Sequence, residues 1–321
     1  MNLFNYTKKD LDQIATELNF VANTLEKVLR LADILRFLNS NMLTRKILGL
    51  KGGTAINLTI FDLPRLSVDI DLDYAVNDSR EEMMKRRELI TEDIKKYLST
   101  ENYTFTARSK SRHSLDSFVF AYKTLSGSTD NIKIEINYSL RAHIFNIEFR
   151  PTVARAIVPG FSVNSLAAPE IFAGKINALL SRTAPRDLYD VYNMIKNGFF
   201  QEKDERDMLR KAVVFYRVIS QKEINEELSL DHLDRITSHQ IRTDLIPVIQ
   251  NGEVLVLEKI QNTVRSFISE LMILTNEERE FIRLFAVKKY MPELLFNDNT
   301  ILEKIRHHPM AIWKMQQHNP M

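Results

Sequence analysis

Two short stretches of the sequence combine residue types that could hold a phosphate group and a divalent cation. The first is Lys51-Gly52-Gly53-Thr54, which contains two of the eight glycines of the chain. Adjacent glycines permit a tight turn with positive φ, and without Cβ atoms they let a phosphate approach the backbone. The N–H groups of a helix that starts here would point at that phosphate, and Thr54 adds a hydroxyl donor.

The second stretch is an Asp-x-Asp pattern. Asp69, Asp71 and Asp73 alternate with apolar residues between Leu66 and Tyr74, which is the period of a β-strand. Such residues project from one face of a sheet, roughly 6–7 Å apart. Carboxylates this close repel one another without a cation, and Mg²⁺ is commonly held by one or two carboxylates together with substrate phosphates. We therefore predict a Mg²⁺ site at Asp69 and Asp71, with Mn²⁺ as the alternative ion, and expect Asp73 to be peripheral.

A further carboxylate, Glu135, lies in the stretch 132–137, where isoleucines alternate with polar residues. This alternation places Lys133, Glu135 and Asn137 on one face of a second strand. If that face also carries the aspartates, Glu135 is a third metal ligand. The pattern is equally compatible with Glu135 as an ion-pair partner near Lys133, and both interpretations stay open.

The apolar pattern predicts the elements that position these residues, a mixed α/β region followed by a helical one. Expected strands lie at 47–50, 66–74, 103–108, 117–123, 131–138 and 152–157. Expected helices lie at 8–40, 55–60, 79–98, 169–180, 186–196, 206–220, 263–273, 277–288 and 300–306. The sequence thus predicts two domains, at 1–200 with its N-terminal helices and at 201–321.

Composition excludes several classes of protein. The chain has no cysteine among its 321 residues, which excludes disulfide frameworks, thiol catalysis and cysteine metal sites. Its 44 basic and 42 acidic residues give a net charge of +2, without the basic excess of a protein that coats nucleic acid, although a sum cannot exclude a local basic patch. Lys8 and Lys9 precede any long apolar run, and no stretch is long enough to span a bilayer, so we expect a cytoplasmic protein without membrane contact.

Taken together, the sequence resembles the nucleotidyltransferase superfamily, and more closely the AbiEii-type toxins of bacterial toxin–antitoxin systems. The matching stretches occur in the order of the family and are Lys51-Gly52-Gly53-Thr54-Ala55, 65–72, Lys133-Ile134-Glu135, 169–175 and 186–191. The resemblance implies a mixed sheet flanked by helices, followed by an all-helical C-terminal domain that carries no recognised motif.

The resemblance also implies an activity, which is transfer of a nucleotide from a nucleoside triphosphate to an acceptor, notably the 3′ end of tRNA. It implies that Asp69 and Asp71 hold the metal, that Lys175 contacts phosphate and that Asp187 completes the catalytic set. The expected nucleotide-binding residues are Lys51, Gly52, Gly53, Thr54, Ser67 and Arg186. The family often has Asp in place of Glu135.

Several roles stay open at this point. Asp187 could orient Lys175 or accept the proton of the acceptor, and Asp190 is expected to brace Arg186 or its helix. Without the resemblance, Lys175 could equally be a surface lysine.

The resemblance implies an antitoxin partner and a role in growth arrest or phage defence. Two other functions stay open, a non-catalytic module that binds nucleotide or RNA, and a metal-dependent phosphodiesterase. The nucleotide, the acceptor and the oligomeric state are not set by the sequence.

Overall fold

The computed structural model describes residues 4–154, 157, 160–221, 224, 226 and 228–317. Contacts divide the chain into two compact units. The first unit comprises the described residues within Met1–Arg141, Ile147–Leu166 and Ile246–Glu253. The second comprises those within Ala142–Asn146, Ala167–Leu245 and Val254–Met321.

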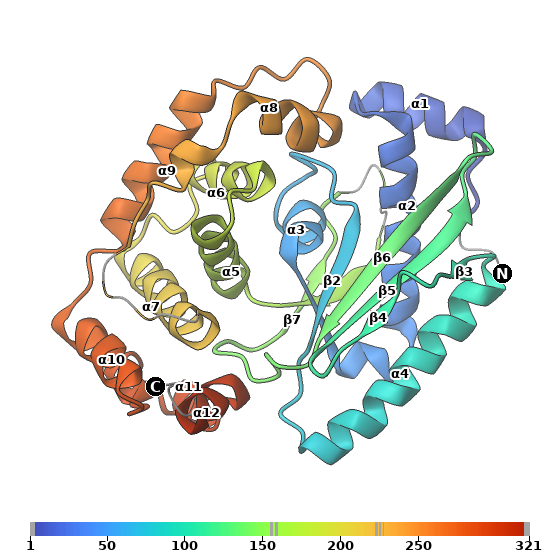
Figure 1. Ribbon diagram of the computed structural model, residues 1–321. Helices are drawn as coiled ribbons and strands as arrows, with labels where there is room; N and C mark the ends of the chain where they lie inside the picture. The colour runs from blue at the N-terminus through green and yellow to red at the C-terminus, as the bar shows by residue number, and fades with distance from the viewer. Residues whose placement is uncertain are drawn as a thin grey trace. The chain divides into compact units, whose positions relative to one another are not determined.

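The first unit is built on a mixed sheet, which has eight strands within the described residues (Figure 1). The order is β3-β5-β6-β2-β1-β8-β7, and β4 also pairs with β5. Pairing is parallel between β2 and β6 and between β1 and β8, and antiparallel elsewhere. The strands are β1 (Leu48–Lys51), β2 (Asp69–Tyr74), β3 (Thr104–Phe105), β4 (Lys110–Ser111), β5 (Leu115–Lys123), β6 (Thr129–Asn137), β7 (Glu148–Pro151) and β8 (Ser162–Ser165).

One face of this sheet is buried and the other is partly exposed. Even-numbered residues at 116–122 of β5 and 132–136 of β6 are buried, whereas the odd-numbered residues between them are partly exposed. The helices α2 (Ala22–Ser40) and α4 (Arg80–Thr100) cover the buried face. Arg30 of α2 lies 4.4 Å from the ring centre of Tyr122, and Arg87 of α4 forms an ion pair of 2.6 Å with Asp116. The partly exposed face therefore carries the polar residues of the expected site.

The N-terminal region forms two helices in place of the single helix expected at 8–40. Helix α1 (Lys8–Leu18) ends at Asn19, which adopts the left-handed conformation with φ of 59° and caps the helix, and α2 begins at Ala22. Asparagine tolerates this conformation better than most residues, and it stops the helix although the apolar period continues across the break. The short helix η1 (Thr44–Lys46) then leads into β1.

A segment from late in the sequence completes the first unit. Residues Ile246–Val248 form the short helix η5, and Ile249 forms a β-bridge with Arg65. The amide of Leu66 donates to the carbonyl of Val248 at 2.6 Å, and the amide of Asn251 donates to the carbonyl of Asn19 at 2.7 Å. The elements described within 201–321 are all helical, as expected, but the segment 246–253 groups with the first unit.

The second unit is helical in its described part, as expected. Its longer helices are α5 (Ala168–Ser181), α6 (Pro185–Lys196), α7 (Lys203–Ser220), α9 (Leu257–Leu271) and α10 (Asn276–Ala286). Its shorter ones are η3 (Leu233–Arg235), α8 (Ser238–Gln240), η4 (Ile241–Leu245), η6 (Pro292–Leu294), α11 (Asn299–Ile305) and α12 (Pro309–Gln316).

The mixed α/β class is confirmed, and the exceptions are local. The strand expected at 103–108 is reduced to the two residues of β3. In place of the strand expected at 152–157, the chain forms β7 at Glu148–Pro151, and Arg155 and Ala156 lie outside the described residues. The division by contacts also differs from the expected boundary at residue 200, because α5 and α6 group with the later helices. Among the described residues, no helix has the length and apolar character needed to cross a membrane.

Candidate functional site

The two glycines after β1 lie against polar side chains of the first unit. Gly52 has φ of +69°, and a Cβ at this position would lie 2.5 Å from Oδ2 of Asp71. A Cβ at Gly53 would lie 2.5 Å from Nη2 of Arg65 and 2.8 Å from Oγ of Ser67. Such separations are far shorter than van der Waals contact, so a side chain at Gly52 or Gly53 would displace these groups, and Gly52 also has a positive φ. The turn is thereby brought directly against the Asp-x-Asp strand.

A helix starts at this turn, as α3 (Gly52–Ala55), and continues as the π-helical segment η2 (Ile56–Ile60). Its N-cap residue is Lys51, whose side chain has no acceptor for the first backbone N–H groups. A negatively charged ligand at this end would interact favourably with those groups and with the helix dipole. The binding of phosphate at this helix start stays a prediction.

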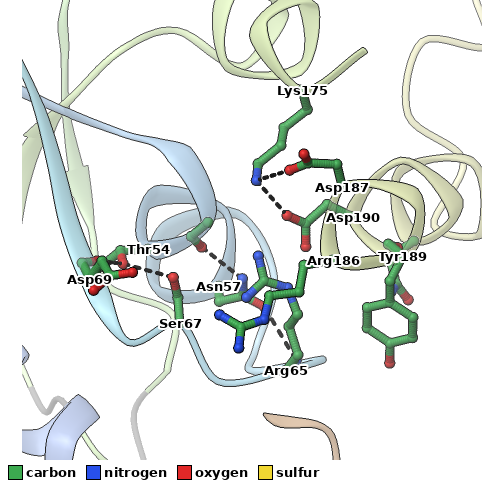
Figure 2. A network of polar contacts seen from close by, with 12 residues as sticks. Thr54, Asn57, Arg65, Ser67, Asp69, Lys175, Arg186, Asp187, Tyr189 and Asp190 are labelled. Carbon is green, nitrogen blue, oxygen red and sulfur yellow. Dashed lines mark hydrogen bonds and ion pairs between the residues drawn. The ribbon is translucent and has the colours of Figure 1, made fainter. Parts of the chain in front are cut away.

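The hydroxyl of Thr54 is engaged within the protein. It donates to the backbone carbonyl of Asp69 at 2.5 Å and lies 3.0 Å from Oγ of Ser67, and Thr54 itself is buried (Figure 2). Thr54 therefore joins the start of β2 to the helix after the turn. Its expected contact with a triphosphate stays a prediction.

The register of β2 and β6 places three carboxylates and one lysine side by side. Asp69 pairs with Lys133 and Asp71 pairs with Glu135 in this parallel ladder. Residues directly opposite in neighbouring strands point to the same face, which here is the partly exposed one. The expected grouping of Glu135 with the two aspartates on one face follows from this register.

Lys133 supplies a positive charge among these carboxylates. Its ammonium forms an ion pair of 2.8 Å with Glu135. Burial alone would lower the pKa of Lys133, but the hydrogen bond and charge of Glu135, and then the charges of Asp69 and Asp71, raise the pKa above its ordinary value. The shift indicates that all three carboxylates act electrostatically on one amine.

The donor set fits a magnesium ion that is completed by substrate. Mg²⁺ is commonly held by one or two carboxylates together with phosphate oxygens and water. Asp69 and Asp71 provide two carboxylates on one face of β2, and that of Asp71 lies beside the turn. Within the described residues, no group of three or more acidic, histidine or cysteine side chains is arranged to hold a metal. Glu135 is instead paired with Lys133, so its role as a third ligand stays a prediction.

Asp73, the last aspartate of the strand, has a different environment from the other two. It is buried and forms an ion pair with Lys51 of β1. This pair joins the two strands next to the turn. Lys51, expected to bind nucleotide, is thus held at the edge of the site by Asp73.

The second unit holds the expected catalytic lysine in a buried cluster (Figure 2). Lys175 of α5 forms ion pairs of 2.9 Å with both Asp187 and Asp190 of α6. The side chain of Lys175 is only 10% exposed, which excludes the interpretation as a surface lysine. Asp190 contacts Lys175, a partner that its position in the sequence did not suggest.

Asp187 also binds Arg182, whose Nε lies 2.8 Å from its carboxylate. Burial alone would raise the pKa of Asp187, but the charge of Lys175 and the hydrogen bond from Arg182 outweigh it and hold the pKa below its ordinary value. The ionised form of Asp187 is thereby favoured beside Lys175. Arg186 donates from Nε to the carbonyl of Asp244 at 2.7 Å.

Arg65 and Asn57 are polar residues of the first unit to which the sequence interpretation gave no role. Asn57 donates to the carbonyl of Gly53 at 2.7 Å and accepts from the amide of Arg65 at 3.2 Å. Both side chains are buried, and Arg65 also donates to the carbonyl of Leu66 at 2.9 Å. Arg65 stands two residues before Ser67, but its spacing alone gives no indication that it lies under the turn.

Comparison with known families decides the class of this protein. Residues 36–277 of the chain match the family model described as the nucleotidyl transferase AbiEii toxin of type IV toxin–antitoxin systems. This chain belongs to the AbiEii family. It is accordingly a nucleotidyltransferase of the toxin type, and the matched range includes both groups of candidate residues.

The fold is also similar to that of a solved protein of this kind. The chain superposes on MenT4, a nucleotidyltransferase toxin from Mycobacterium tuberculosis H37Rv, with a TM-score of 0.64 and 14% sequence identity. The superposition covers 97% of this chain and 98% of MenT4. None of the curated protein sequences matches the chain.

Proposed function

We propose that this AbiEii protein transfers a nucleotide from a nucleoside triphosphate to RNA, with the 3′ end of tRNA as the acceptor, and that the reaction requires Mg²⁺. The observation that carries the proposal is the contact between Gly52 and Asp71. It brings a turn suited to phosphate against a carboxylate pair suited to a cation. A triphosphate with its metal needs both features within a few ångströms of each other.

The reaction itself needs positioning and charge stabilisation more than covalent help. The terminal hydroxyl oxygen of the RNA attacks the α-phosphorus, and a new P–O bond forms. The bond from that phosphorus to the oxygen shared with the β-phosphate breaks, pyrophosphate leaves, and the hydroxyl proton passes to water. When bound, Mg²⁺ neutralises the charge that develops on the phosphate oxygens.

Each group of residues has a separate task in this proposal. Asp69 and Asp71 hold the metal, and the N–H groups that follow Lys51 hold phosphate oxygens. The family resemblance implies that Lys175 contacts phosphate, and its ion pairs with Asp187 and Asp190 fix its ammonium within the second unit. Asp187 orients Lys175 rather than accepting a proton, because its lowered pKa makes it a weak base.

The test measures transfer of labelled nucleotide to bulk tRNA by Asp69→Asn and Asp71→Asn, with Asp62→Asn as the control because Asp62 is an exposed aspartate of the same unit. Loss of a metal ligand removes several kcal/mol of transition-state stabilisation, so each variant should be slower by at least about a thousandfold. Asp62→Asn should retain the wild-type rate. Full activity in both site variants would refute the metal assignment.

Lys175 is less suitable for this test. Its removal would leave two buried carboxylates without their shared cation, which typically costs about 3–5 kcal/mol of stability. An inactive Lys175 variant would therefore not separate loss of catalysis from loss of folding.

Nucleotide binding and nucleotide release, measured beside transfer, distinguish the two alternative functions. Binding of nucleotide by the wild type without transfer to any RNA would favour the non-catalytic module. Release of nucleotides from RNA without incorporation would favour a phosphodiesterase. The type IV toxin family implies an antitoxin partner, and we propose that both proteins act in the cytoplasm.

A further inference from the structure

An exposed basic segment lies at the edge of the sheet that carries the aspartates. Arg108, Lys110 and Arg112 alternate with serines, and the sequence has no acidic residue between Glu101 and Asp116. All three basic residues are exposed. Within the part of the chain that the structure describes, none of the three has an ion-pair partner, whereas Lys51, Arg87 and Lys133 of the same unit are all paired.

The serines between them hold this segment in place. Oγ of Ser109 accepts from the amide of Val119 in β5 at 2.9 Å, and Oγ of Ser111 donates to Asp116. The backbone carbonyls of Arg112 and His113 accept from the guanidinium of Arg87 at 2.6 and 2.9 Å. The three basic side chains are therefore displayed from a fixed backbone.

Arg87 is the buried anchor of this arrangement. It belongs to α4, is almost fully buried, and binds both carboxylate oxygens of Asp116 at 2.9 and 2.6 Å. A buried arginine with its carboxylate partner holds the segment firmly without involving the exposed charges. Because its backbone is already fixed, the segment loses less conformational entropy on binding a ligand than a mobile segment would.

The register places Lys110 on the same face of the sheet as the aspartates. Lys110 pairs with Ser117, Ser117 pairs with Glu135, and Glu135 pairs with Asp71. Residues paired in this way share a face, so Lys110 lies in line with Asp71 across three strand spacings, on the order of 15 Å. A flexible strand of a few nucleotides can extend over that distance.

We propose that Arg108, Lys110 and Arg112 bind backbone phosphates of the RNA acceptor and lead its 3′ end to the carboxylates. This inference rests on the proposed transfer to RNA. Lys110 belongs to the two-residue strand β4, Arg108 lies in the turn before it and Arg112 directly follows it, so three exposed charges lie close together in the sequence for neighbouring phosphates. Charges at the edge of a sheet can also prevent it from pairing with the sheet of another molecule. Protection of the edge, however, does not require three unpaired charges on the approach to the site.

The test compares the triple variant Arg108→Gln/Lys110→Gln/Arg112→Gln with a control that removes three exposed lysines elsewhere, Lys8→Gln/Lys9→Gln/Lys96→Gln. The measurements are KM for labelled bulk tRNA, KM for the nucleoside triphosphate, and tRNA affinity over a series of salt concentrations. The triple variant should raise KM for tRNA at least about tenfold and reduce the salt slope by roughly two units, since each phosphate contact contributes about 0.7. Its KM for the triphosphate should stay at the wild-type value.

The outcomes separate this inference from the proposed function. If the triple variant and the control have the same KM for tRNA and the same salt slope, the basic segment does not bind RNA. Weakened binding of the antitoxin with unchanged binding of tRNA would assign the segment to the protein partner and overturn the inference. If the wild type transfers no nucleotide to RNA, the proposed function fails, and the salt series on tRNA binding still tests the segment.

Discussion

The carboxylate of Asp71 has room beside the turn only because residue 52 has no side chain. Gly52 meets two separate demands, a positive φ and the close approach of Asp71. Gly127, in the hairpin between β5 and β6, meets only the first demand, since a Cβ there would have open space around it. The two positions therefore form a matched pair that separates backbone strain from crowding of the site.

We predict that Gly52→Ala abolishes nucleotide transfer, whereas Gly127→Ala retains it. Each substitution places a Cβ on a residue with positive φ, which lowers the stability of the fold by about 1 kcal/mol. Gly52→Ala also displaces Asp71. Urea unfolding with the transfer assay measures both effects. Equal activity in the two variants would mean that the contact with Asp71 has no part in the reaction.

At the scale of single residues, the sequence predicts those site residues whose grouping depends only on near neighbours in the chain. The grouping of Asp69 with Asp71 follows from a spacing of two, and the turn follows from two adjacent glycines. The burial of Lys175 could not be predicted, because it depends on partners contributed by another helix, Asp187 and Asp190. The roles of Arg65 and Asn57 depend on tertiary contacts in the same way.

At the scale of the element, helix α2 contains a carboxyl group that weakens the fold at neutral pH. Asp33 is buried, and burial raises its pKa to about 6, although the nearby Arg36 acts to lower it. Its Oδ1 binds Arg36 at 2.9 Å, while Oδ2 has no hydrogen-bond partner within the described residues. The folded state therefore binds this proton more tightly than the unfolded state does.

The pH dependence of stability follows from that difference. Because the pKa of Asp33 is higher in the folded state, its contribution to stability falls as the pH rises from about 4 to about 6. Asp33→Asn removes the charge, so the variant should be more stable than wild type by about 1–2 kcal/mol at pH 8, with little difference at pH 4. Thermal unfolding at both pH values measures this, with Asp12→Asn, an exposed aspartate of α1, as control. A gain of the same size at both pH values would contradict the assignment.

Long elements with a regular apolar period are predictable from this sequence, and short or interrupted ones are not. Helix α4 begins where expected, with Ser79 accepting from the amide of Glu82. The strands β7 and β8 have four residues each, too few for alternation to stand out from chance. The end of α1 depends on the left-handed backbone conformation of Asn19, which cannot be predicted from the apolar pattern.

At the scale of the whole molecule, the boundary expected at residue 200 stays a prediction that a fragment can test. Fragment 1–200 would lack the segment 246–253, which belongs to the first unit, and would retain α5 and α6 without the later helices of the second. We expect it to unfold at a lower urea concentration than the full chain and with less cooperativity. A cooperative transition at the midpoint of the full chain would establish an independent domain ending near residue 200.

The sequence does not reveal this organisation because strand and helix patterns describe local order only. Val248 and Ile249 are apolar residues between helices, and nothing in their spacing shows that they return to the strand region. Their backbone contacts with Leu66 and Arg65 join residues separated by more than half of the chain.

The late return of segment 246–253 has a consequence for how this toxin is made. A ribosome releases Asp69 and Asp71 early in translation, but the backbone partners of Leu66 and Arg65 are supplied only once Val248 and Ile249 have emerged. The backbone beneath Arg65 and Ser67 is therefore completed late during synthesis. A nascent chain, or a product truncated by a premature stop codon, carries both aspartates without the segment that completes their unit.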